Sequence, residues 1–201
     1  MGDVELAVAA IRAGRPVILP TDTVYGLCAS PYREAPAAAV YRLKGRPEMV
    51  PSALLCSDLD VLLECVPELR GRAGVYARAV LPGPYTLVLP NPARRFRWLN
   101  GVALDTIGVR VPALEGAARE VLQQVGAVMA TSANRHRGLA PKRLEDVPQE
   151  IRDACEAEID GGELPGVPST VIDVTGPEPL VLREGAVPAA EALRRLAAVA
   201  A

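Results

Sequence analysis

Two cationic side chains separated by a single glycine are the first candidates for chemistry in this sequence. Lys44 and Arg46 flank Gly45, and Pro47 follows them. Residues two positions apart in an extended segment lie on one face, so we expect both cations to sit together in a loop. Glycine permits close approach of a backbone to a ligand, and two cations on one face suit a polyphosphate. The alternative is an ordinary solvated cluster on the surface.

An arginine inside an apolar strand is the second candidate. Arg110 interrupts the apolar run of residues 107–111 and, by strand alternation, shares a face with Thr106. A buried guanidinium requires an anionic partner. That partner is either an internal carboxylate, such as Asp105 or Asp22, or a substrate carboxylate held by two parallel hydrogen bonds. The pattern leaves both readings open.

Small polar residues gather at the ends of other apolar segments. Residues 20–27 read Pro-Thr-Asp-Thr-Val-Tyr-Gly-Leu, and residues 129–134 read Met-Ala-Thr-Ser-Ala-Asn. A weaker segment covers residues 168–173 and is followed by residues 182–186. The hydroxyl, amide and backbone N–H groups of such residues can surround an anion. Ordinary turn chemistry is the alternative.

Cysteine and histidine usage argues against metal and triad chemistry. The cysteines at positions 28, 56, 65 and 155 form no Cys-x-x-Cys pair, and His136 is the only histidine. We therefore expect neither a zinc site nor a disulfide framework. His136 lies between two arginines, which would lower the pKa of a catalytic base, so a Ser-His-Asp triad is not expected either.

Composition limits the class of protein. The chain has 201 residues, of which 50% are apolar, and its net charge is −2. This length predicts a single domain over residues 1–201, and the charge balance excludes a histone-like protein or a disordered acidic tail. No apolar run is long enough for a transmembrane helix, and the acidic N-terminus lacks the basic region of a secretory signal. We expect a cytoplasmic protein.

Helical and strand patterns alternate along the chain, which is typical of an α/β domain. Helices are predicted over residues 3–13, 34–43, 59–66, 68–81, 114–125, 148–157 and 188–198. Strands are predicted over residues 17–20, 52–56, 85–89, 107–111, 127–131, 170–174 and 180–183. Because open α/β sheets bind ligands in loops at strand ends, the polar segments above are placed where a site is expected.

Six segments in order resemble one known family. They are TDTVYGL, LKGRP, LDTIGVRVP, TSAN, PSTVID and LREGAV. Together they are similar to the YrdC-like threonylcarbamoyl-adenylate synthases, and the resemblance runs from about residue 14 to residue 187. It implies an α/β fold with a twisted, open, mostly mixed sheet, flanked by helices around a large, positively charged concave cleft.

The resemblance also implies an activity. Members of the family condense L-threonine, bicarbonate and ATP into threonylcarbamoyl-AMP and pyrophosphate. The product feeds the threonylcarbamoyl modification of adenosine in tRNA, and partner proteins perform the transfer. We expect Mg²⁺ to arrive with ATP rather than in a dedicated protein site, and direct RNA contact through the basic cleft is left open.

The family pattern assigns roles to nine residues of this sequence. Lys44, Arg46, Ser132 and Asn134 match the catalytic signature around the nucleotide phosphates. Thr106 and Arg183 match further ATP-binding positions. Thr23, Arg110 and Ser169 match the positions that hold threonine.

The sequence departs from the common family pattern at four positions. Val50, Leu55, Ala140 and Pro168 stand where Asn, His, Ser and Glu are common. A non-catalytic RNA- or nucleotide-binding module that keeps the cleft is therefore an alternative. Another is the carbamoyl-adenylate chemistry of hydrogenase-maturation proteins, but we see no counterpart of their acylphosphatase-like and zinc-finger regions. We also expect no counterpart of the C-terminal domain of longer family members.

Overall fold

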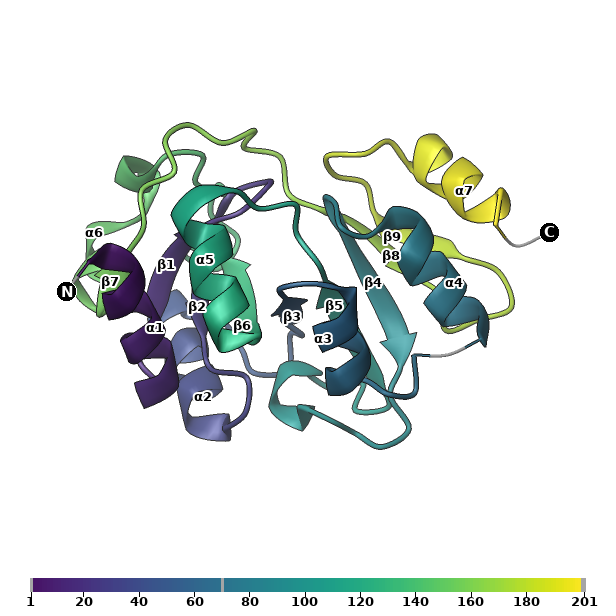
Figure 1. Cartoon of the computed structure of the whole chain (residues 1–201), viewed down its shortest axis with the longest axis horizontal. Helices are drawn as coiled ribbons and strands as arrows, with labels where there is room; N and C mark the ends of the chain where they lie inside the picture. The colour runs from purple at the N-terminus through teal and green to yellow at the C-terminus, as the bar shows by residue number, and fades with distance from the viewer. Residues whose placement is uncertain (1, 70, 200–201) are drawn as a thin grey trace.

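The predicted α/β architecture is confirmed by the computed structural model, which describes residues 2–69 and 71–199. Its strands form one sheet with the order β7-β1-β2-β6-β3-β5-β4-β8-β9 (Figure 1). The strands are β1 Val17–Pro20, β2 Tyr25–Ala29, β3 Ala53–Cys56, β4 Tyr85–Pro90, β5 Thr106–Arg110, β6 Ala127–Ser132, β7 Ala157–Glu158, β8 Thr170–Asp173 and β9 Leu180–Arg183. The α-helices are α1 Asp3–Ala13, α2 Glu34–Lys44, α3 Leu59–Cys65, α4 Gly71–Val80, α5 Gly116–Val125, α6 Gln149–Asp153 and α7 Ala189–Ala197.

The sheet is mixed, as expected. Strand β3 pairs parallel with β5 and antiparallel with β6, and β4 pairs antiparallel with β5 and parallel with β8. Figure 1 shows α1 and α5 near one end of the long axis and α4 and α7 near the other, with the sheet running between them. Within the described residues, no helix combines the length and apolar character needed to cross a bilayer.

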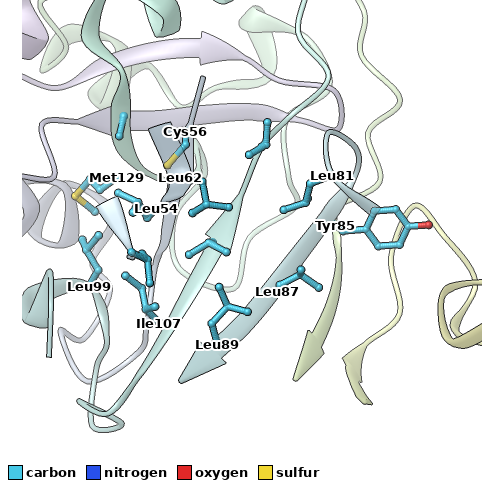
Figure 2. Close-up of a cluster of buried hydrophobic side chains, with 14 of the residues drawn as sticks. Leu54, Cys56, Leu62, Leu81, Tyr85, Leu87, Leu89, Leu99, Ile107 and Met129 are labelled. Atoms are coloured by element: carbon cyan, nitrogen blue, oxygen red, sulfur yellow. The ribbon is translucent and has the colours of Figure 1, made fainter. Parts of the chain in front are cut away.

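One face of the sheet builds the main core. Alternate residues of neighbouring strands point into it, among them Leu54 of β3, Leu87 of β4, Ile107 of β5 and Met129 of β6 (Figure 2). Leucine, valine and alanine supply most of this core, in keeping with an aromatic content of only 3%. The alternation leaves Thr106, Gly108 and Arg110 on the other face of β5, as the sequence pattern predicted.

The other face of the sheet is only partly covered. Helices α1 and α5 pack together over it through a second apolar cluster, which includes Ile11 of α1, Val121 of α5 and Val128 of β6. The rest of this face stays open and forms the floor of a cavity. The position of the two helices therefore decides where the sheet can take a ligand.

Three element predictions need correction. The helix predicted over residues 148–157 is wrong, because α6 ends at Asp153 and the chain then forms β7, which pairs parallel with β1. Strand β2 was missed, since all five of its residues are buried and show no alternation. Helix α2 continues one residue beyond the predicted end, through Lys44. Part of the helix predicted over residues 68–81 is α4, and residue 70 lies outside the described residues.

Candidate active site

The open face of the sheet holds a cavity of about 320 Å³. Small side chains on neighbouring strands form much of its floor, among them Gly26, Ala53, Gly108 and Ala130. Seven of the nine predicted site residues line it, namely Thr23, Arg46, Thr106, Arg110, Ser132, Ser169 and Arg183. Lys44 and Asn134 are not among the lining residues. The fold therefore brings the separated sequence segments into one site.

Arg110 has an internal carboxylate partner. Its Nη2 pairs with the Oδ1 of Asp22, and both side chains are 9% exposed. Asp22 Oδ2 also accepts a hydrogen bond from the backbone N–H of Ala113, at 3.1 Å. Of the two internal partners that the sequence allowed, Asp22 is the one found.

The pair with Asp22 does not use all the hydrogen-bond donors of Arg110. Its Nη1 and Nη2 each lie 3.3 Å from Thr23 Oγ1, and the buried Nε has no partner. A guanidinium has five N–H donors. Donors therefore remain for an anion in the cavity beside the internal pair.

Thr21 and Thr23 form a hydroxyl relay that ends on Arg110. Thr21 Oγ1 donates to the carbonyl of Val24 at 2.7 Å and lies 2.9 Å from Thr23 Oγ1. Because the proton of Thr21 is used on Val24, the Thr23 hydroxyl donates to Thr21 and accepts from Arg110. The β1–β2 turn thus fixes the orientation of both Thr23 and the arginine.

Ser169 and Arg183 form a second polar group in the wall. The Ser169 hydroxyl lies 2.8 Å from Thr86 Oγ1 and accepts from Arg183 Nη2 at 3.2 Å. Arg183 also donates to the Ser169 carbonyl at 2.7 Å. Thr86 was not identified from the sequence. A single polar residue in an apolar strand does not indicate which distant residue it will contact.

Lys44 does not lie in a loop, contrary to the sequence prediction. It is the last residue of α2, and Gly45 ends the helix with a φ of 61° while donating its N–H to the carbonyl of Arg42. The Lys44 side chain is buried and its Nζ contacts four oxygens of Ser132 and Asn134. These are Ser132 O at 2.5 Å, Ser132 Oγ at 3.3 Å, Asn134 O at 2.7 Å and Asn134 Oδ1 at 2.6 Å.

These contacts give Lys44 a position behind the cavity wall. An ammonium has three N–H donors, and the oxygens of the turn over residues 132–134 engage them. Ser132 Oγ in turn donates to Asn134 Oδ1 at 2.6 Å, and Asn134 Nδ2 donates to the carbonyl of Gly138 at 2.5 Å. Lys44 therefore fixes the turn that presents Ser132 to the cavity.

Arg46 is the member of the cation pair that lines the cavity. Its guanidinium donates to Thr131 Oγ1 at 3.1 Å, to the carbonyl of Val50 at 3.4 Å and to the carbonyl of Pro51. These contacts are to neutral oxygens only. Its charge consequently remains uncompensated by any described carboxylate at hydrogen-bond distance.

The site is electropositive. Burial, with the nearby charge of Arg46, lowers the pKa of Lys44 to about 7. Burial also lowers the pKa of Arg46, Arg110 and Arg183, and Arg183 disfavours the charged forms of the other two arginines. Asp22 is the one carboxylate that the structure places at hydrogen-bond distance from these cations. Such a group of close cations is stabilised by a polyanion.

The described residues that line the cavity include no carboxylate that could bind a resident metal ion. No Asp or Glu lines the cavity, and no cluster of three metal-ligating side chains occurs among the described residues. The four cysteines are free. The donor set therefore fits an anionic ligand and does not fit a cation held by protein ligands alone.

Comparison with known proteins places the chain in a family. The Sua5/YciO/YrdC family model, described as "Telomere recombination", matches residues 9–185. The chain belongs to the Sua5/YciO/YrdC family. The family predicted from the six sequence segments is therefore confirmed.

Family relatives resemble the chain in sequence and in fold. A protein of Pyrococcus abyssi named threonylcarbamoyl-AMP synthase is 36% identical over 94% of this chain and 55% of its own length. A human protein of the same name is 34% identical, over 85% of this chain and 62% of its own. The crystal structure of P. abyssi Sua5 complexed with L-threonine matches with a TM-score of 0.87 at 35% identity, over 96% of this chain and 56% of that one. The chain thus spans somewhat more than half the length of these relatives.

The four residues that depart from the family pattern differ in whether they line the cavity. Leu55 and Pro168 line the cavity, whereas Val50 offers its backbone carbonyl to Arg46. Ala140 is not among the lining residues. Partial desolvation and the charge of Arg137 lower the pKa of His136, which also lies outside the lining. Only two of the four departures thus line the cavity.

Proposed function

We propose that this chain is a threonylcarbamoyl-AMP synthase that condenses L-threonine, bicarbonate and ATP, releasing pyrophosphate. The observation that carries the proposal is one cavity lined by a buried arginine, by several serine and threonine hydroxyl groups and by two further arginines. Family membership and the relatives' names support the same activity. A Sua5 relative was crystallised with L-threonine, which supports an amino-acid subsite here.

In this proposal, Arg110 holds the threonine carboxylate with the donors that Asp22 and Thr23 leave free. The Asp22 contact and the Thr23 hydroxyl keep the guanidinium plane in place before substrate arrives. A planar fork of N–H donors matches a carboxylate better than an ammonium does. Ser169, held between Thr86 and Arg183, completes the amino-acid end.

The phosphates of ATP occupy the other cations. Arg46 and Arg183 neutralise phosphate charge, and Ser132 orients a phosphate oxygen. Lys44 and Asn134 act as positioning residues, because they fix the turn that carries Ser132. Thr106, which lines the cavity and donates to Ala103, lies on the nucleotide side.

The reaction needs positioning more than proton transfer. The amine of threonine captures carbon dioxide as a carbamate and loses a proton, or reacts with bicarbonate to give the same carbamate and water. A carbamate oxygen then attacks the α-phosphorus of ATP, and the bond to the β-phosphate breaks as pyrophosphate leaves. The residues of the site align these groups and stabilise the charge that develops on the phosphate oxygens. Mg²⁺ enters as MgATP, part of the substrate.

We place the protein in the cytoplasm, where its product would pass to proteins that modify tRNA. Direct RNA contact would use the basic cleft that holds Arg46 and Arg183. Leu55 and Pro168 favour a second candidate, a nucleotide-binding module without turnover, because both replace common polar residues inside the cavity.

The deciding experiment is pyrophosphate release with threonine, bicarbonate and ATP omitted one at a time. We expect release to fall to background whenever any one of the three is absent. ATP binding without turnover would support the non-catalytic module, and hydrolysis at an equal rate without threonine would indicate a general nucleotide hydrolase.

Protonation of Lys44 gives a prediction for ATP binding. With a pKa of about 7, Lys44 is mostly neutral in the free protein at pH 8. The negative charge of the triphosphate beside the cation cluster raises the pKa of Lys44. The protein should therefore take up protons from solution when it binds ATP at pH 8, at most about one proton per ATP bound. Calorimetry in two buffers of different ionisation enthalpy measures the uptake. The uptake should disappear in Lys44→Met, and an equal uptake in both proteins contradicts the assignment.

A further inference from the structure

Two polar residues of the cavity wall have buried oxygens without a hydrogen-bond partner. Asn100 is 2% exposed and Ser52 is 6% exposed, and both line the cavity. Within the described part of the chain, Asn100 Oδ1 and Ser52 Oγ are among the few buried polar atoms left unpaired. An unpaired buried polar atom is destabilising, so a ligand that completes the bond gains affinity.

The surrounding backbone holds both side chains in place. Asn100 Nδ2 donates to the carbonyl of Arg95 at 3.1 Å, which leaves Oδ1 as the free acceptor. The N–H of Ser52 donates to the carbonyl of Leu99 at 2.9 Å. Gly101 has a φ of +59°, and a Cβ there would lie 2.3 Å from the carbonyl oxygen of Met49. The two segments are thus packed too closely for either side chain to shift freely.

The hydroxyl group of Tyr41 lies near Ser52 and adds a third polar group to Ser52 and Asn100. The buried Tyr41 hydroxyl approaches Ser52 closely enough to affect its own pKa, which burial raises, but neither hydroxyl completes a hydrogen bond. Tyr41 can therefore donate to Ser52 once the Ser52 proton is given to a ligand. Asn100 Oδ1, by contrast, can only accept.

This end of the cavity lies beside the phosphate-binding Arg46, which donates to the carbonyl of Pro51, and apart from the carboxylate clamp at Arg110. Ser52 precedes β3, and Thr106 begins β5, the neighbouring parallel strand. The register pairs Ala53 with Gly108, so Ser52 lies about level with Ile107, three residues before Arg110 and about 10 Å from it along the strand at the usual rise. Neutral donors and acceptors at this distance from the carboxylate clamp suit the base of a nucleotide rather than its phosphates.

We infer that Ser52 and Asn100 bind a purine base and that Asn100 selects its 6-amino form, an inference that rests on ATP being the nucleotide of the proposed function. The exocyclic amine would donate to Asn100 Oδ1, and the adjacent ring nitrogen would accept from the Ser52 hydroxyl. A 6-oxopurine presents an oxygen and a ring N–H in these places, so its oxygen would face Asn100 Oδ1 without a proton between them.

The test compares the binding of ATP with that of inosine triphosphate, which has the 6-oxo group, by calorimetry without threonine or bicarbonate. Wild-type protein should bind ATP at least about 10-fold more tightly. Asn100→Leu should weaken ATP binding about 3- to 10-fold and leave inosine triphosphate within 2-fold. Ser52→Ala should weaken the binding of both nucleotides, because a hydroxyl can donate to the ring nitrogen of adenine or accept from the ring N–H of hypoxanthine. Ser57→Ala, a serine outside the cavity lining, is the matched control and should change neither.

Equal weakening of both nucleotides in Asn100→Leu, or unchanged ATP binding in that variant, overturns the inference. Thermal unfolding checks that each variant is folded, and Asn100→Ala replaces Asn100→Leu if the leucine variant does not fold, because it removes the same amide without adding a branched side chain. Failure of this inference can be distinguished from failure of the proposed function. If only the proposed function fails, the protein still binds ATP more tightly than inosine triphosphate but releases no threonine-dependent pyrophosphate.

Discussion

Arg46→Ala should lower kcat/KM for threonine-dependent pyrophosphate release by about 10²–10³-fold, the usual cost of removing one group that stabilises developing charge. Arg46 lines the cavity, and its three contacts are to Thr131 and two backbone carbonyls rather than to a carboxylate. The charge is therefore free to act on a phosphate. Steady-state kinetics and thermal unfolding on the same preparation measure the effect.

Arg42→Ala is the matched control for this experiment. Arg42 lies in the last turn of α2, is exposed and is not among the cavity-lining residues, so the same loss of charge should leave the rate within 2-fold. Full activity of Arg46→Ala would remove Arg46 from the site. An unfolded Arg46→Ala protein would instead assign it a structural role.

Lys44 should behave differently, although only one residue separates it from Arg46. Lys44→Ala removes a buried amino group whose Nζ contacts Ser132 and Asn134. Ser132 O and Asn134 Oδ1 each keep one donor, but Asn134 O loses the Lys44 donor. One unsatisfied buried group costs about 1–3 kcal/mol and the lost side chain also leaves a cavity, so the free energy of unfolding should fall by about 2–4 kcal/mol. Urea denaturation compares this variant with Arg46→Ala, and equal stability of the two contradicts the positioning role.

The contrast between these two residues shows where the sequence pattern was informative. An extended pattern placed Lys44 and Arg46 together on one face of a loop, but Gly45 serves here as the left-handed residue that ends α2. The sequence does not distinguish a glycine that ends a helix from a glycine that lets the backbone approach a ligand. Packing of Lys44 beneath the turn at residues 132–134 is a long-range contact that no local pattern contains.

Strand alternation, in contrast, predicted the cavity face of β5 correctly. Thr106 and Arg110 line the cavity, while Ile107 and Val109 enter the core. The same reasoning could not choose between Asp22 and Asp105 as the partner of Arg110, because that choice depends on how the β1–β2 turn meets β5. Ser52 and Asn100 were missed for a related reason, since an orphaned oxygen is defined by its three-dimensional surroundings.

Arg110→Lys should weaken threonine binding about 10- to 100-fold and leave ATP binding within about 3-fold. A lysine keeps the positive charge beside Asp22 but lacks the fork that holds a carboxylate by two hydrogen bonds, and charge-assisted bonds contribute about 1.5–3 kcal/mol each. Separate calorimetric titrations with threonine and ATP measure the two affinities. Arg119→Lys, an exposed arginine of α5, is the matched control and should change neither.

Lysine is the informative replacement because the internal pair must survive the test. Arg110→Ala would leave the Asp22 side chain, which is 9% exposed, without its cation, and breaking such a buried pair costs about 3–5 kcal/mol. A loss of binding in that variant would then report unfolding as readily as a missing clamp. In Arg110→Lys, selective loss of threonine affinity identifies Arg110 as the clamp. An equal loss for both ligands would show that Arg110 serves only its pair with Asp22.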